Sequence, residues 1–96
     1  MATINIQSES QQNGSWVYDV VLDDRGTTHQ YTVTLNSSEY KSWAQNQAEP
    51  SDVIKAAFEF LLEREPASSI MSSFDCSVIR RYFPDVDREL PKKLSA

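Results

Sequence analysis

The chain has 96 residues, of which 40% are hydrophobic and 24% charged, and its formal net charge is −5 at pH 7. This length predicts one domain with its own core, and the single cysteine excludes an intrachain disulfide. The negative charge disfavours non-specific binding to nucleic acid or to an anionic membrane. No apolar run approaches the about 20 residues of a membrane span, and the first ten residues lack a signal-peptide pattern, so we expect a cytoplasmic protein.

Three segments with alternating hydrophobic residues predict a β-meander in the first third of the chain. They cover residues 2–7, 16–22 and 27–35. Asn13-Gly14 and residues 23–26 are typical of the turns between them. A four-residue loop over 23–26 would pair Leu22 with Thr27, and this register places the large side chains of both strands on one face.

The first hairpin raises a question of register. A two-residue Asn13-Gly14 loop alone would place Ile4 and Ile6 on the polar face of the sheet. A loop of odd length, or a β-bulge, would return both isoleucines to the core face. The sequence therefore predicts one of these two irregularities and leaves the choice between them open.

Helical periodicity begins after the third strand. Asn36 and Glu39 have capping-box spacing and predict a short helix. The main helix is predicted over residues 50–65, because Pro50 suits a first helical position and Pro66 ends the helix. Its apolar arc is roughly 200° wide, about twice the stripe of a helix that is buried on one side only. This helix therefore needs cover on two sides, from the sheet and from the C-terminal segment.

Two short helices are predicted after the main helix. They cover residues 68–73 and 76–83, with Asp75 as the cap of the second. Pro84 stops that helix. The residues that follow are charged and include Pro91, so we expect the chain to fray there.

These elements predict an α+β fold. A three-stranded antiparallel β-meander is followed by a short helix, a main helix and one or two short C-terminal helices, all packed on one sheet face. We expect a single domain over residues 1–90 and a flexible C-terminal tail over 91–96. Phe58 and Leu61 lie on the apolar arc of the main helix and are expected in the core.

No catalytic, cofactor-binding or metal-binding motif stands out, and no small-molecule ligand is indicated. His29 and Cys76 are the only histidine and cysteine. A Cys–His nucleophile would need them in contact, whereas we expect a strand histidine near the sheet margin and a reduced, partly buried cysteine. Asp19, Asp23 and Asp24 lack the ligand spacing of a calcium loop. Two glycines are too few for a P-loop or a dinucleotide-binding fingerprint.

Four charged residues near the end of the main helix look like an active-site cluster only by their number. Glu59 and Glu63 belong to the polar side of the helix, where a solvated face explains them. Arg64 and Glu65 project toward the apolar arc at the helix end, where we expect them to pair or to extend their charged groups toward water.

Arg80 and Arg81 are the candidates for contact with nucleic acid. A helix-turn-helix over residues 68–83 would bring both to a phosphate. Its helices would be short and the chain is acidic, so we do not expect nucleic-acid binding. The sequence leaves open what these two arginines contact.

The sheet face away from the helices is a candidate surface for a partner. Under the predicted register Val17 pairs with Thr32 and Val21 with Thr28, so two valines lie among threonines. This face is either solvated or an interface for another protein or a second copy of the chain. The unpaired edge of the sheet offers strand addition as a second docking mode.

Residues 54–84 contain a distinctive order of side chains. The pattern is Phe58-Glu59-Phe60-Leu61-Leu62-Glu63-Arg64-Glu65-Pro66, then Ser69-Ile70-Met71, Phe74-Asp75, Ile79 and Tyr82-Phe83-Pro84. It resembles a family of small uncharacterised bacterial proteins. This resemblance implies a bacterial, cytoplasmic protein, and it carries over no activity and no functional residue. The order of strands before helices also resembles small antitoxin domains, at the level of the fold alone.

We therefore expect a non-enzymatic protein-interaction or regulatory module. The alternative is a DNA-linked regulator of the antitoxin kind, which a positive stripe on the C-terminal helix would favour. A third possibility is an enzyme with an unrecognised site, which a cleft that holds His29 and Cys76 together would favour.

Overall fold

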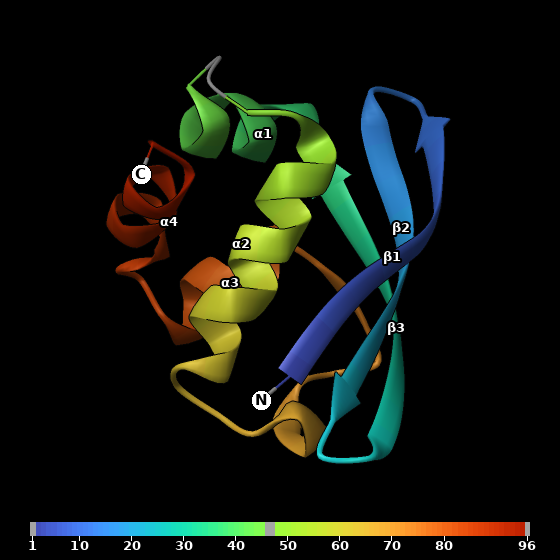
Figure 1. The fold of residues 1–96 in the computed structure, drawn as a ribbon. Helices are drawn as coiled ribbons and strands as arrows, with labels where there is room; N and C mark the ends of the chain where they lie inside the picture. The colour runs from blue at the N-terminus through green and yellow to red at the C-terminus, as the bar shows by residue number, and fades with distance from the viewer. Residues whose placement is uncertain (1, 46–47, 96) are drawn as a thin grey trace.

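The computed structural model of the protein describes residues 2–45 and 48–95. It has the predicted α+β class, with a β-meander first and helices packed on one face of the sheet (Figure 1). The strands are β1 (Ala2–Gln12), β2 (Ser15–Asp24), β3 (Thr27–Asn36) and β4 (Ser73–Asp75), in the sheet order β1-β2-β3-β4. The helices are α1 (Ser37–Ala44), α2 (Pro50–Leu62), the 3₁₀ turn η1 (Ala67–Ser69), α3 (Ser77–Tyr82) and α4 (Val86–Ser95).

The first hairpin contains a β-bulge, one of the two irregularities that the sequence predicts. Asn13 and Gly14 form its turn, with φ of 48° and 79°, as a type I′ turn requires. The extra residue Gln7 then shifts the register between β1 and β2. Because of this shift Ile4 and Ile6 lie opposite core residues of β2 and pack, half-buried, against the core.

The second hairpin closes on a tighter turn than predicted. Arg25 and Gly26 alone form the turn, with φ of 54° and 84°. Leu22 consequently pairs with His29, and the predicted pairing with Thr27 was wrong. The difference is two residues, and side chains alternate with a period of two, so each residue stays on its predicted face.

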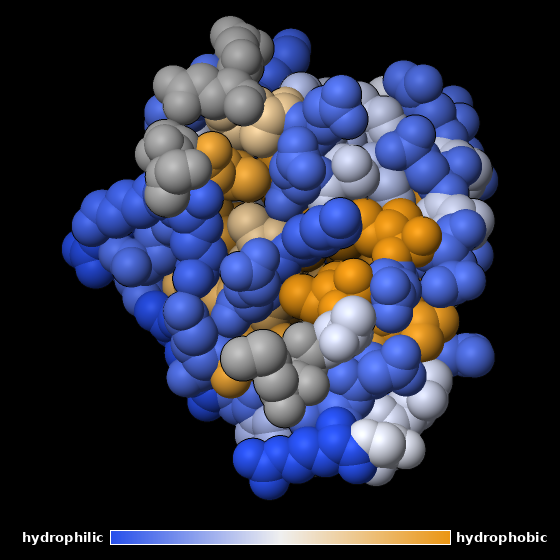
Figure 2. Space-filling view, viewed as in Figure 1, coloured by the Kyte–Doolittle hydropathy of each residue, from blue (hydrophilic) through white to orange (hydrophobic). Residues whose placement is uncertain are grey.

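The main helix α2 is covered on two sides, as its wide apolar arc predicts. It lies between the sheet and the C-terminal helices (Figure 1). Phe58 is fully buried and Leu61 is 4% exposed, so their predicted place in the core is confirmed. On this side of the molecule most of the surface is hydrophilic, and hydrophobic side chains reach it beside α2 and over β1 (Figure 2).

The ends of α2 follow local rules. Glu49 and Asp52 form a capping box at its start, around Pro50. The helix ends at Leu62, three residues before the predicted end at residue 65. Proline disfavours the α conformation in the residue before it, so Pro66 already affects the chain at Glu65.

The segment after α2 differs most from the prediction. Residues 68–73 were predicted as a helix, but they leave η1 and enter β4, a short strand parallel to β3. The Thr32 backbone N–H donates to the Ser72 carbonyl at 2.8 Å, and the Cys76 N–H donates to the Thr34 carbonyl at 2.8 Å. A strand of three residues is too short to show the alternation by which strands are predicted.

The C-terminal helix α4 takes the place of the predicted frayed end. Val86 and Leu90 are fully buried and Leu94 packs half-buried against the core, so every fourth residue of one face is apolar. The predicted flexible tail over 91–96 is therefore corrected: residues 91–95 continue α4 through Pro91, and residue 96 lies outside the described residues. Burial of this apolar row offsets the stability that is lost because Pro91 cannot donate a backbone hydrogen bond within the helix.

Candidate functional site

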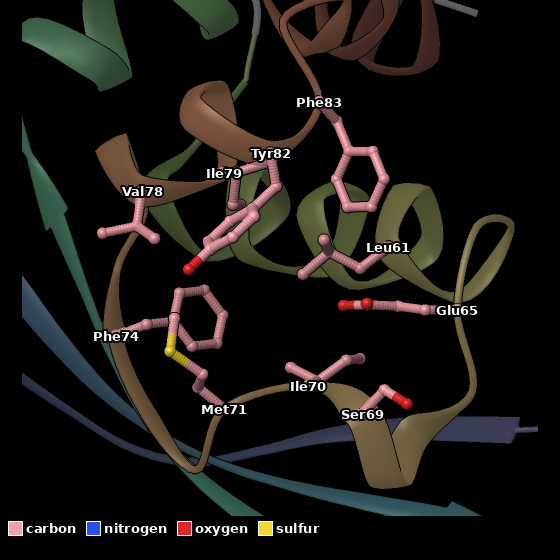
Figure 3. Close-up of a pocket in the computed structure, with 10 residues that line it drawn as sticks. All are labelled: Leu61, Glu65, Ser69, Ile70, Met71, Phe74, Val78, Ile79, Tyr82 and Phe83. Atoms are coloured by element: carbon pink, nitrogen blue, oxygen red, sulfur yellow. The ribbon is translucent and has the colours of Figure 1, made fainter.

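A cleft of about 230 Å³ opens between the end of α2, the segment that leads into β4, and α3 (Figure 3). Its lining is mostly hydrophobic, and its polar groups are the Glu65 carboxylate and the hydroxyls of Ser69 and Tyr82. The lining residues are Leu61, Glu65, Ser69, Ile70, Met71, Phe74, Val78, Ile79, Tyr82 and Phe83. Small-molecule sites commonly occupy about 300–1,000 Å³, so this cleft suits a side chain better than a metabolite.

The floor of the cleft belongs to the hydrophobic core. Leu61, Ile70, Phe74 and Ile79 are all buried, and they come from α2, the link to β4, β4 itself and α3. The Tyr31 hydroxyl donates to the Ala67 carbonyl at 2.7 Å and ties η1 to the sheet. The floor is therefore fixed by packing, as a preformed binding surface requires.

The rim of the cleft holds two exposed hydrophobic side chains. Tyr82 is 66% exposed and Met71 is 45% exposed, and they are the large hydrophobic residues that stand out as exposed in the described part of the chain. Single exposed hydrophobic residues are common, whereas these two lie beside one apolar cleft. Tyrosine and methionine are also enriched in protein–protein interfaces.

Sequence reasoning missed this cleft. In the helix predicted over residues 76–83, the helical period puts Tyr82 on the same side as Ile79, which the structure shows to be buried. In the structure α3 has only six residues, and the part of its apolar face that carries Tyr82 borders the cleft instead of the core. The available signal was the apolar face of the helix predicted over residues 76–83, which the main helix and the sheet do not cover completely.

Glu65 is the acidic group of the cleft. Its carboxylate points inward between Leu61 and Ile70 (Figure 3). Within residues 2–45 and 48–95 this carboxylate has no hydrogen bond and no ion pair. Its neighbours along the chain are engaged: Glu63 lies 2.8 Å from the Lys93 ammonium, and Arg64 lies 2.5 Å from the Asp85 carboxylate. Of the two expected arrangements, pairing or extension toward water, Arg64 shows pairing, and Glu65 does not pair within the described residues.

Arg80 is held by ion pairs on the other side of α3. Its Nε donates to Asp87 Oδ2 at 2.7 Å and its Nη2 to Asp87 Oδ1 at 2.8 Å, while Nη1 lies 3.5 Å from a Glu39 oxygen. The indole N–H of Trp43 donates to the same Asp87 oxygen at 2.8 Å. These hydrogen bonds hold the pKa of Asp87 below its usual range, and the bond from Arg80 has the largest effect. Arg80 thus joins α1, α3 and α4, whereas Arg81 is exposed.

The region considered for a helix-turn-helix has a different shape. Residues 68–73, its predicted first helix, run from η1 into β4. A helix-turn-helix needs two helices that pack across a turn. In addition, Arg80 would have to leave Asp87 and Glu39 before its guanidinium could reach a phosphate.

His29 and Cys76 do not meet. The backbone of Cys76 bonds to Thr34, which lies about 16 Å along an extended strand from His29. His29 stacks on Tyr31, with ring centroids 6.4 Å apart. Cys76 is fully buried, and burial raises the pKa of its thiol.

Two aspartates of the hairpins, Asp19 and Asp23, accept hydrogen bonds from nearby hydroxyl groups. Asp19 accepts hydrogen bonds from Ser8 at 2.8 Å and from Thr32 at 3.3 Å. Asp23 accepts one from Thr28 at 2.9 Å. Among the residues that the structure describes, no group of three or more histidine, cysteine, aspartate or glutamate side chains could hold a metal ion.

The outer face of the sheet is polar, with two half-buried valines. The pairs are Val17 with Thr34 and Val21 with Gln30, in place of the predicted partners Thr32 and Thr28. The tighter turn of the second hairpin causes this difference. A hollow of about 640 Å³ on this face is lined largely by polar side chains, including Asp19, whose hydrogen bonds are made within the sheet.

Comparison of the chain with protein-family models, curated proteins and solved structures finds no match. Within the described residues, no helix of the chain is long and apolar enough to cross a membrane.

Proposed function

We propose that the chain is a non-enzymatic protein-interaction module and that it binds a partner through the cleft at the end of α2. The observation that carries this proposal is the convergence of Tyr82 and Met71 on one preformed apolar cleft. Interface energy concentrates where aromatic anchors stand beside a packed pocket. A partner that covers this cleft would remove both side chains from water.

The chemistry of the cleft supports binding over catalysis. Its polar groups are the Glu65 carboxylate and the hydroxyls of Ser69 and Tyr82. An activated serine nucleophile needs a hydrogen bond to a base, and no such bond joins Ser69 to Glu65 in the described structure. The walls are otherwise hydrocarbon and aromatic, which suits the apolar part of a protein partner.

Site-specific photocrosslinking in the native host tests the proposal. A photoreactive phenylalanine derivative is placed at Tyr82 and, as control, at Thr28, which is exposed on the outer sheet face. We expect discrete protein adducts from position 82 and none of the same mass from position 28. The partner identified from these adducts is then purified, and its affinity for each variant is measured. We expect it to bind Tyr82→Ser at least about tenfold more weakly than wild type and to bind Thr28→Ser as tightly as wild type. Identical adducts from both positions, or none from position 82, would overturn the proposal.

A further inference from the structure

We infer that the cleft selects a basic side chain of the partner protein, arginine in preference to lysine, with Glu65 as the residue that recognises it. This inference rests on the proposed function, and it names the chemical class of the group that enters the cleft.

The first reason is the position of the Glu65 carboxylate. It projects into the cleft between two buried aliphatic side chains, and no described residue bonds to it. A wholly apolar occupant would cover this carboxylate and remove its water without supplying a donor, which is costly for a charged group. A cationic occupant supplies donors at the place where the desolvation occurs.

The second reason is the shape of the walls. Leu61 and Ile70 flank Glu65 (Figure 3), so an aliphatic stem that ends in a charge can lie along them while its end meets the carboxylate. Aromatic rings from Phe74, Tyr82 and Phe83 complete the lining. A planar guanidinium stacks on such rings and can bond a carboxylate through two N–H groups, whereas an ammonium is a compact and strongly hydrated charge.

The third reason is that the chain itself uses the same combination beside the cleft. The Arg64 guanidinium lies 3.8 Å from the centroid of the Phe60 ring and 5.9 Å from that of Phe83, and it pairs with Asp85. Phe83 also lines the cleft. Aromatic rings and a carboxylate therefore already hold one arginine at this surface, and Glu65 with Tyr82 and Phe74 offers a second place of the same kind.

Nuclear magnetic resonance titration of the whole chain tests the inference without knowledge of the partner. The probes are N-butylguanidinium, N-butylammonium and the neutral N-butylurea, observed through the methyl signals of Leu61 and Ile70. The variants are Glu65→Gln and, as the matched control, Glu59→Gln, which makes the same change of charge at an exposed position of α2. Unchanged backbone amide spectra verify that both variants are folded.

We expect N-butylguanidinium to shift the Leu61 and Ile70 signals saturably in wild type and in Glu59→Gln, and to bind Glu65→Gln about tenfold more weakly. N-butylammonium should bind wild type more weakly than N-butylguanidinium. N-butylurea should bind weakest, with no difference between wild type and Glu65→Gln.

The other outcomes overturn separate statements. Equal weakening in Glu59→Gln would mean a long-range effect of net charge and would overturn the role of Glu65. Equal binding of N-butylurea and N-butylguanidinium would overturn selection of a basic group, while crosslinking from position 82 would still support the cleft as a docking site. Tighter binding of N-butylammonium would overturn the preference for arginine. If no probe shifts either residue, the inference is wrong, and the crosslinking result alone decides the proposed function.

Discussion

Replacement of Leu90 by alanine tests whether α4 is part of the core. Leu90 is fully buried in α4, which packs on α1 and α2. The change removes three carbons, worth about 0.8 kcal/mol each by transfer from water, or about 2.4 kcal/mol. The cavity that remains adds to this value, and buried leucine-to-alanine changes cost about 2–5 kcal/mol. We therefore expect a loss of about 3–4 kcal/mol from a total of about 5–15 kcal/mol.

Urea unfolding measures the free energy of unfolding, with tryptophan fluorescence and far-ultraviolet circular dichroism as two independent signals. The melting temperature should fall by more than about 10 °C. Arg88→Ala is the control on the same helix, because the Arg88 side chain is 71% exposed, and its effect should stay within about 0.5 kcal/mol. If Leu90→Ala costs no more than this control, α4 is not packed in solution and the predicted loose C-terminal segment describes the chain better.

Two further predictions concern titratable groups. The bond from Arg80 keeps the pKa of Asp87 below its usual value of about 3.9, so the stabilisation is present above that value and is lost as the pH falls through the lower folded pKa. Urea melts from about pH 5 to about pH 2 should therefore show a steeper loss for wild type than for Asp87→Asn, and parallel curves would contradict this role of Asp87. Burial raises the pKa of the Cys76 thiol, so its reaction with a thiol reagent at neutral pH should be slow until the chain unfolds, and equally slow in His29→Ala. A fast reaction of the folded chain that His29→Ala abolishes would contradict the separation of the two residues.

The predictable part of the fold is the part that local patterns control. Alternation placed the three strands of the meander, and the wide arc of α2 predicted a helix buried on both sides. A regular first hairpin would place Ile4 and Ile6 on the polar face, which predicted an irregularity in the pairing. The bulge at Gln7 is that irregularity. In each case the pattern extends over many residues, so a shift of two residues in one turn leaves it intact.

The unpredicted part depends on contacts between distant segments. β4 exists because β3 offers an unpaired edge to a segment that η1 holds in place, and three residues carry no periodic signal of that pairing. In α4 the interior Pro91 and the dense charges obscured the apolar row of Val86, Leu90 and Leu94. The cleft was missed for the same reason, because its walls come together only through η1, β4 and α3.

The bulge at Gln7 has a second consequence, at the free edge of the sheet. β1 is an outer strand of eleven residues, and it contains neither lysine nor proline, the residues that commonly protect an edge. A flat edge of this length presents a regular row of unpaired backbone groups, onto which strands of other copies can add and start aggregation. The bulge breaks the regular spacing of that row and increases its twist. One inserted residue therefore turns two isoleucines toward the core and also makes the edge a poorer template for the growth of intermolecular sheets.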